Sequence, residues 1–284
     1  MQPTRWFITL SLLLIACAHR SGRDPVSRQL RKADAELAAA RDPVALDAVI
    51  DSYLLIHSAA AGDPRVLDRL SRVIALRGYW RGGVSGASDL ATARDFGLQC
   101  LKRQPAFAAR TLAAGERITA PAARELGPGA QPCLEETASA WVRWMHLQGA
   151  GGASLDLAPL DLLTARSVQL GQPGRPGAPE ATRGLLLSLW PSVLPGGEPD
   201  RHLAGESALR DALQKAPGRR TISVDLVELV LLPDDRQAEA ATLLEAVLME
   251  PLDQDDPEWI EDSAAIARAQ RLQDAIQSPD AAAP

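Results

Sequence analysis

Two stretches in the last third of the chain repeat each other at a fixed distance. Three residues recur 34 positions further on: Leu209, Ala212 and Pro217 return as Leu243, Ala246 and Pro251. A helix-turn-helix unit with this period is typical of tetratricopeptide arrays. One helical hairpin cannot bury its apolar face alone, so such units stack on one another. The sequence therefore predicts an all-α fold of stacked antiparallel helical hairpins, a tetratricopeptide-like α-solenoid bundle.

The repeat divides into two predicted hairpins. The first contains helices at 180–190 and 200–215, and the second contains helices at 221–231 and 236–249. Residues 221–232 are rich in β-branched side chains, which favour strands by propensity alone. Because this segment occupies the first-helix position of the second hairpin, we expect it to be helical.

Amphipathic helices are expected before and after this repeat. Asp42-Pro43 and Asp63-Pro64 are typical helix starts, since aspartate caps free amides and proline suits the first helical position. Apolar residues at helical spacing predict further segments at 26–40, 43–56, 64–74, 88–102, 106–118, 133–148 and 155–170. Residues between Arg81 and Gly86 are expected to form a flexible turn. A last helix, starting at Asp256-Pro257, is expected to cap the array.

The amino-terminal residues resemble a bacterial lipoprotein signal. Arg5 precedes an apolar run at 6–15, which is shorter than a membrane span. Leu14-Ile15-Ala16-Cys17 then resembles a lipobox, which implies lipidation of Cys17 and cleavage before it. The alternative is an ordinary secretory signal that happens to contain a cysteine. Ala18 follows the cysteine, where aspartate would mark inner-membrane retention, so we expect an outer-membrane protein facing the periplasm and held by its lipid anchor.

These signals divide the chain into four parts. We expect a signal peptide at 1–16, a lipidated tether at 17–28, a helical-repeat domain at 29–277 and a disordered tail at 278–284. Cys100 and Cys133 remain after processing, and an oxidising compartment would allow them to form a disulfide. Two unpaired core cysteines are the equally weighted alternative.

Composition and motifs argue against several classes of function. The formal net charge is −6 and no basic patch is evident, so nucleic acid is not an expected partner. The chain has neither a zinc-type histidine pair, a glycine-rich phosphate loop nor a nucleophile elbow. The acidic run at 253–262 lacks the ligand spacing of a calcium loop. We therefore predict a protein that is not an enzyme, with no catalytic residues, cofactor or metal site.

The tryptophans are the best candidates for a ligand site. Trp141, Trp144 and Trp190 are large apolar groups in a chain with only 4% aromatic residues. They could line a cleft between helices, or they could pack in the core between stacked hairpins. We keep both interpretations.

From Cys133 onward the sequence resembles the T component associated with tripartite ATP-independent periplasmic (TRAP) transporters, the TatT family of helical-repeat lipoproteins. The resemblance rests on four segments in order: Ala140-Trp141-Val142-Arg143-Trp144 running to Gly149, Leu194-Pro195-Gly196-Gly197 with the helix 204–212, Pro217-Gly218-Arg219, and Leu243 to Leu248 before Pro251. The chain has Glu198 where the family often has aspartate, and Ala140 where it often has tyrosine.

The resemblance implies an all-helical tetratricopeptide-like array that can form a homotrimer, with a central or per-subunit passage. It also implies a non-catalytic role: docking a periplasmic solute-binding protein and passing it a hydrophobic or organic-acid ligand. A lipid-anchored scaffold for an outer-membrane assembly is the alternative. Handover predicts a continuous apolar cavity near Trp141 and Trp190, whereas a scaffold predicts a filled core and an exposed groove.

Overall fold

The computed structural model describes residues 24–148, 156–171, 175–190, 198–253 and 258–277. Throughout these ranges the regular structure is helical and no strand is present, which confirms the predicted all-α class. Within the same ranges, none of the helices combines the length and the apolar character needed to span a bilayer. The predicted signal peptide, Cys17 and the predicted tail lie outside the described residues.

The first half of the described chain contains long helices joined by short connections. They are α2 (Pro25–Ala39), α3 (Pro43–Ala59), α4 (Pro64–Arg81), α5 (Gly83–Leu101), the short α6 (Pro105–Ala113) and α7 (Ala120–Arg124), the 3₁₀ turn η1 (Pro128–Ala130), α8 (Gln131–Gln148) and α9 (Leu157–Leu170). The second half contains α10 (Ala178–Leu189), α11 (Glu198–Lys215), α12 (Arg220–Leu226), the π turn η2 (Val227–Leu231), α13 (Gln237–Met249) and α14 (Trp259–Gln277). The β-branched segment 221–232 is thus helical, as predicted.

Aspartate–proline pairs begin the first three helices. The Asp42 carboxylate accepts a hydrogen bond from the Ala45 amide at 2.8 Å, and Asp63 accepts one from the Arg65 amide at 2.9 Å. Asp24 caps α2 in the same way, with the Val26 amide at 3.1 Å. Helix α2 therefore begins at Pro25, so the last four residues of the predicted tether are helical.

The turn between α4 and α5 is much shorter than predicted. Helix α5 begins at Gly83, not at Ser88, because Gly82 adopts a left-handed φ of 59° and reverses the chain in one residue. Gly78 and Gly86 then face each other so closely that a Cβ atom on Gly86 would collide with the Gly78 carbonyl oxygen. The glycines between Arg81 and Gly86 therefore form a tight helical hairpin instead of a flexible turn.

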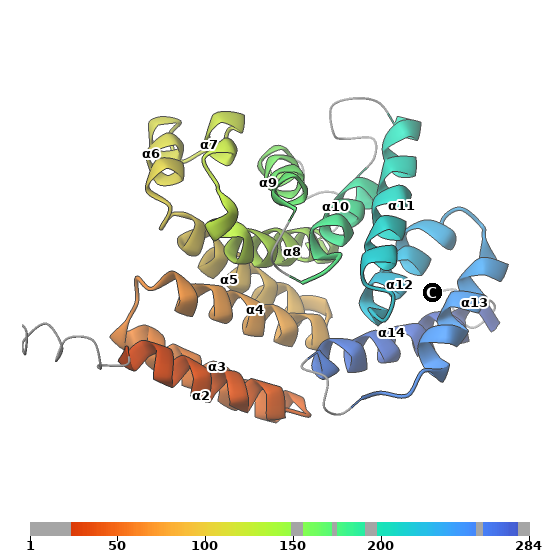
Figure 1. The fold of residues 1–284 in the computed structure, drawn as a ribbon. Coiled ribbons are helices and arrows are strands. Elements are labelled where there is room, and N and C mark those ends of the chain that lie inside the picture. The colour runs from red at the N-terminus through yellow and green to blue at the C-terminus, as the bar shows by residue number, and fades with distance from the viewer. Residues whose placement is uncertain (1–23, 149–155, 172–174, 191–197, 254–257, 278–284) are drawn as a thin grey trace, which may run out of the picture.

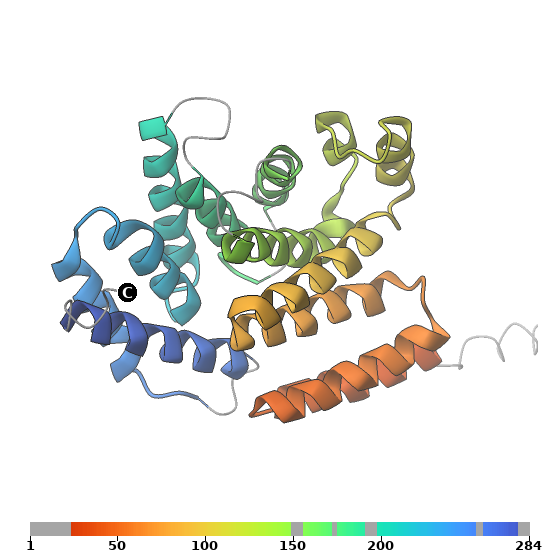
Figure 2. The ribbon, with the colours of Figure 1, turned by 180° about the vertical axis from the view of Figure 1, so that it is seen from behind.

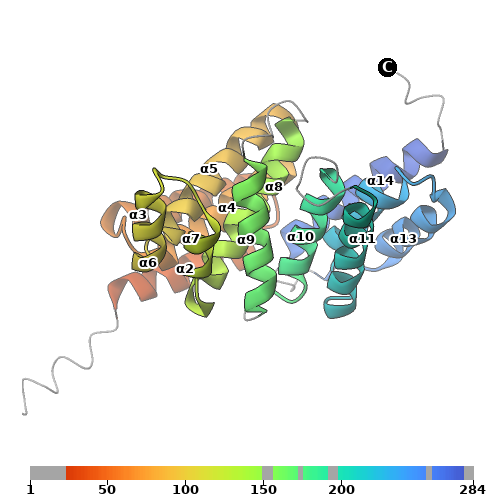
Figure 3. The ribbon, with the colours of Figure 1, turned by 90° about the horizontal axis from the view of Figure 1, so that it is seen from above.

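Most neighbouring helices pack on one another along the chain, and α5 packs on α8 across the intervening α6 and α7. Contacts join α2 to α3, α3 to α4, α4 to α5, α5 to α8, α8 to α9, and α10 to α11, and Figure 1 shows this succession from the N-terminal helices to the C-terminal ones. Seen from above in Figure 3, the helices follow one another from the α2–α3 side to the α13 side. Helix α14 packs on α12 and α13 but also reaches back to α4, as the view from behind shows (Figure 2). The predicted cap therefore also joins the two halves of the protein.

The two segments of the predicted repeat are helical, but their buried residues do not recur 34 positions apart. Leu209 and Ala212 on α11 are fully buried, whereas Ala246 on α13 is exposed and Leu244 and Val247 are buried instead. The buried face has moved by one residue, which is a rotation of about 100° around the axis of an α-helix. The π turn η2 lies between the two helices; there the Leu232 amide donates to the Val227 carbonyl, five residues back, at 3.0 Å. A period of 34 therefore matches the helix ends, at Lys215 and Met249, but not the buried faces.

Candidate functional site

The two remaining cysteines join neighbouring helices. Cys100 on α5 and Cys133 on α8 form a disulfide, with their Cα atoms 5.8 Å apart. Both residues are buried in the apolar cluster that also contains Phe107 and Leu134. The disulfide therefore links α5 to α8 within the core.

The three candidate tryptophans pack against apolar neighbours. Trp141 and Trp190 are 6% and 7% exposed and belong to one apolar cluster, and Trp144 packs against its edge. The Trp141 indole N–H donates to Asp156 at 3.3 Å, and the Arg94 guanidinium lies 4.5 Å from the ring centroid of Trp144. None of the three lines the cavity described next. The structure thus places them in the core, which is the second of the two interpretations of these tryptophans.

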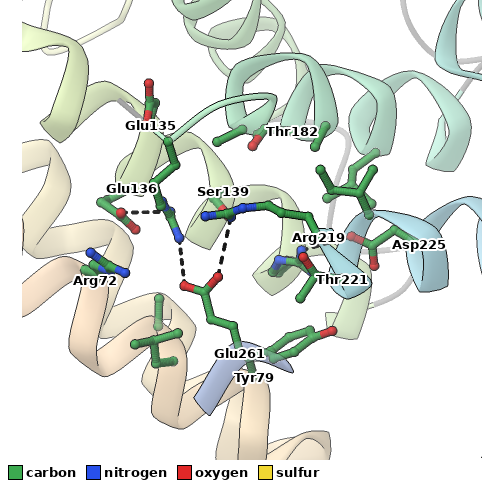
Figure 4. Close-up of a pocket in the computed structure, with 18 residues that line it drawn as sticks. Arg72, Tyr79, Glu135, Glu136, Ser139, Thr182, Arg219, Thr221, Asp225 and Glu261 are labelled. Atoms are coloured by element: carbon green, nitrogen blue, oxygen red, sulfur yellow. Dashed lines mark hydrogen bonds and ion pairs between the residues drawn. The ribbon is translucent and has the colours of Figure 1, made fainter. Parts of the chain in front are cut away.

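A cavity lies elsewhere, where helices from both halves of the protein converge. Its walls come from α4, α8, α10, α12 and α14, together with the residues just before α10. Eight charged side chains line it: Arg72, Glu135, Glu136, Arg143, Arg175, Arg219, Asp225 and Glu261. Figure 4 shows six of these groups, Arg72, Glu135, Glu136, Arg219, Asp225 and Glu261, coming from several different helices. We refer to this space as the central cavity.

Arg175 and Arg219 hold one side of the central cavity together. Arg175 contacts Glu136 at 2.8 Å and Glu261 at 2.7 Å. Arg219 contacts Glu261 at 3.6 Å and also pairs with Glu258, and Figure 4 shows Glu261 reaching toward Arg219. Burial alone would raise the pKa of Glu261, but the neighbouring arginines outweigh it and lower that pKa. These pairs tie α8 and α14 to the segments that precede α10 and α12.

A second charged cluster lines the other side of the central cavity. Asp225 on α12 is 1% exposed and pairs with Arg143 at 3.0 Å and Arg268 at 2.9 Å. Both guanidinium groups lie over the Tyr79 ring, 4.7 and 5.3 Å from its centroid. Burial would raise the pKa of Asp225, yet Arg143 and Arg268 lower it overall, so the cluster stays ionised. We call Tyr79, Arg143, Asp225, Glu228 and Arg268 the tyrosine cluster.

Further cavities adjoin the central one on either side. Tyr79 and Arg143 also line a second cavity, together with Leu90 of α5, Glu228 of η2 and Leu272 of α14. Glu135 and Arg175 also line a third cavity beside Gly177 and Lys215. The central cavity thus shares lining residues with two further cavities, and Tyr79 and Arg143 of the tyrosine cluster line both the central and the second cavity.

Arg72 differs from the other arginines in the wall. Its Nε atom is buried without a hydrogen-bond partner among the described residues, and no described carboxylate forms an ion pair with its guanidinium. Asp68, one turn earlier on α4, also has a buried oxygen without a partner. Burial, reinforced by the nearby Glu136, raises the pKa of Asp68 to about 7. Asp68 is therefore only partly ionised at neutral pH, whereas the charge of Arg72 also acts on Glu261, whose pKa it helps to lower.

Sequence reasoning missed this site. Its residues come from positions 72–79, 135–143, 175–185, 219–225 and 261, and no local motif joins them. One usable signal was present on α8, where Glu135, Ser139 and Arg143 recur every fourth residue and form a polar stripe. Such a stripe usually faces solvent, so it did not stand out.

Comparison with known proteins adds no relatives: neither a family model nor a curated protein matches this chain. Among the described residues, no group of three or more histidine, cysteine or carboxylate side chains is arranged to hold a metal ion. The candidate site is therefore defined by its geometry alone.

Proposed function

We propose that the mature protein holds a small solute in the central cavity and passes it to a periplasmic solute-binding protein, without making or breaking covalent bonds. The observation that carries this proposal is the charged central cavity, together with the two cavities that share lining residues with it. A ligand site typically combines a concave space with a few placed polar groups. The resemblance to TRAP-associated T components supports the same role.

The observations divide between the two roles. Trp141 and Trp190 pack in a filled apolar core instead of lining the apolar cavity that handover predicted beside them, and this agrees with a scaffold. The charged central cavity is the observation that favours handover. A scaffold was expected to have a filled core and an exposed groove. Here, helices from both ends of the chain instead surround a space lined by Arg72, Ser139, Thr182 and other polar groups. Burying ionised groups is costly unless they are paired or serve a function. Their concentration around one unfilled space therefore favours a ligand site.

The tyrosine cluster is the natural control point between two of the cavities. Tyr79 and Arg143 belong to both walls, so a solute moving from one cavity to the other would have to pass them. Asp225 and Glu228 hold the two arginines in place. We therefore propose that handover requires Tyr79 to move between its two flanking guanidinium groups.

The proposed cellular position follows from the amino-terminal sequence. The lipobox-like Leu14-Ile15-Ala16-Cys17 would place an acyl anchor on Cys17, ahead of a short tether. The helical domain would then stand in the periplasm at the outer membrane, where a solute-binding protein can reach it.

Affinity capture from periplasmic extract tests this role. The mature chain should retain a solute-binding protein, together with a small molecule that mass spectrometry finds on both proteins. Ala75→Phe should fill the central cavity and remove the small molecule while leaving the partner bound. Ala109→Phe on exposed α6 is the matched control and should retain both. Capture of outer-membrane assembly proteins, with no small molecule on either variant, would contradict the proposal and favour the scaffold.

A further inference from the structure

The outer side of the first helical hairpin, α2–α3, carries an apolar row that no described residue covers. Val44 and Leu55 on α3 are 78% and 72% exposed, and Ala48 between them is exposed as well. These three residues follow one another at intervals of four and seven positions, so they share one side of the helix. The opposite side of α3 is buried against α2 and α4. We call Val44, Ala48 and Leu55 the outer row.

Exposed basic side chains lie beside the outer row on α2. They are Arg28, Arg31 and Lys32. Lys32 lies 3.6 Å from the Glu36 carboxylate, whereas neither arginine forms an ion pair within the described part of the chain. The positive charge of these two arginines is therefore available to a partner outside the protein.

One hydrogen bond places the basic residues and the outer row on the same side of the hairpin. The Ser52 hydroxyl of α3 donates to Glu36 of α2 at 2.8 Å. Ser52 lies four positions after Ala48 and three before Leu55, so it borders the outer row on the side of α2. Glu36 lies one turn after Lys32 on α2. Helix α4 covers the other side of the hairpin, and Figures 1 and 2 show α2 and α3 along one edge of the molecule.

Chain length keeps this hairpin close to the proposed lipid anchor. Asp24, which caps α2, lies seven positions after Cys17, and a chain of that length spans at most about 25 Å. The anchor would therefore hold α2 and α3 nearer to the lipid headgroups than the later helices. A membrane that contains anionic lipids attracts basic residues beside an anchor, and Arg28, Arg31 and Lys32 supply that charge.

We propose that the outer side of the α2–α3 hairpin lies on the anionic phospholipid surface that holds the acyl chains of Cys17. The three basic residues of α2 contact the lipid phosphates, and the outer row of α3 lies among the headgroups. This inference rests on the lipid anchor of the proposed function. It goes beyond that function by naming the face with which the helical domain meets the membrane.

One carboxylate limits the depth of this contact. Asp51 is exposed on the same side of α3, between Ala48 and Leu55. A charged side chain is costly in the hydrocarbon of a bilayer, so the hairpin stays at the level of the headgroups. Asp51→Asn should therefore strengthen the contact with anionic vesicles.

A fluorescent label on the acylated mature protein tests the contact. Ala48→Cys supplies the only free thiol, because Cys17 is acylated and Cys100 is paired with Cys133. In vesicles of equal parts phosphatidylcholine and phosphatidylglycerol, nitrobenzoxadiazole on this thiol should brighten and shift its emission to shorter wavelength. Ala109→Cys on α6, which lies far from the hairpin in Figures 1 and 2, is the matched control and should show neither change. An unchanged label at position 48, in protein that floats with the vesicles, would overturn the proposal.

Charge reversal tests the part played by α2. The double variant Arg28→Glu, Arg31→Glu should lose most of the emission change at position 48, and so should the wild-type charge set in phosphatidylcholine alone or at high salt. The control Arg110→Glu, Arg117→Glu makes the same change in net charge at exposed positions in and after α6 and should keep the signal. Thermal unfolding checks that each variant folds. A full signal in the folded α2 variant, or in neutral vesicles, would overturn the proposal.

Other occupants of the face would give different results. Leu55→Glu should leave unchanged both the mass of the unacylated Cys17→Ser protein in solution and the capture of a solute-binding protein. A complex of copies that Leu55→Glu dissociates, or a captured partner that Leu55→Glu releases, would overturn the assignment to lipid. Protein that floats with vesicles without an emission change removes this inference alone, whereas protein that fails to float also removes the anchor of the proposed function.

Discussion

Helix α8 has two opposite faces that lead to different interiors. One face carries Leu134, Ala138, Trp141 and Met145, which pack into the apolar cluster with the disulfide. The other face carries Glu135, Glu136, Ser139 and Arg143, which line the central cavity. The first interior is filled by side chains, whereas the second retains space and buried charge. The comparison teaches that a polar stripe on an amphipathic helix does not identify the solvent side when other helices cover it.

The largest loss of stability is expected at Asp225 of α12, which faces the charged side of α8 across the central cavity. Asp225→Ala would leave the half-buried Arg143 and Arg268 without their shared counter-charge. Removing one partner of a buried ion pair typically costs about 3–5 kcal/mol, so the free energy of unfolding should fall by about that amount. Urea denaturation measures it. A loss below about 1 kcal/mol would mean that these charges are solvated and that the cavity side resembles an ordinary surface.

Truncation on the two faces of α8 should differ clearly. Leu134 is fully buried, so Leu134→Ala should lower the free energy of unfolding by about 3 kcal/mol. Ser139→Ala removes only a hydroxyl that borders open space and should change it by less than about 0.5 kcal/mol. Paired urea titrations compare the two variants. Equal losses would show that no cavity separates α8 from its neighbours on the charged side.

The disulfide lies in the filled apolar interior, on the side of α8 away from the central cavity. Cys100 and Cys133 are separated by 33 positions, and a crosslink of that loop length typically contributes about 2–4 kcal/mol by restricting the unfolded chain. The double variant Cys100→Ser, Cys133→Ser should therefore unfold at lower urea concentration by an amount in that range. A reducing agent should destabilise the wild type similarly and leave the double variant unchanged. Insensitivity of the wild type to reduction would contradict the pairing.

The smallest expected effect depends on pH and lies at Asp68. Burial and the nearby Glu136 raise its pKa from 3.8 to about 7 in the folded state, so the folded protein holds this proton more tightly than the unfolded chain does. Wild-type stability relative to Asp68→Asn should therefore fall as the pH rises from about 4 to about 7 and stay level above that. At pH 8 the Asp68→Asn variant should be more stable than the wild type by about 1–2 kcal/mol. This figure is smaller than the full pKa shift would give, because the Asp68 side chain is partly exposed to solvent. A difference between the proteins that does not change with pH would exclude the raised pKa.

The sequence allowed the helices to be predicted better than the site. Apolar spacing and the Asp42-Pro43 and Asp63-Pro64 caps act locally, so the helices that they mark were found with small errors at their ends. The tight turn at Gly82 and the shifted face of α13 were missed because they depend on contacts between helices.

The candidate site depends on such contacts even more strongly. Arg175, Arg219 and Glu261 meet only after the chain has folded, and nothing in their spacing indicates that they would. The tryptophans stood out in the sequence because aromatic residues are scarce, but scarcity does not distinguish a cleft from a core. The charged residues were too common to stand out.

The central claim is that the polar face of α8 borders a cavity that other helices cover, and the accessibility of one engineered thiol tests it most directly. Ser139→Cys should react with a small methanethiosulfonate reagent but only slowly with a bulky polyethylene glycol maleimide. Ala109→Cys, at an exposed position on α6, should react rapidly with both reagents. Equally fast reaction of both thiols with the bulky maleimide would show that the polar face of α8 is open to solvent and would contradict the account.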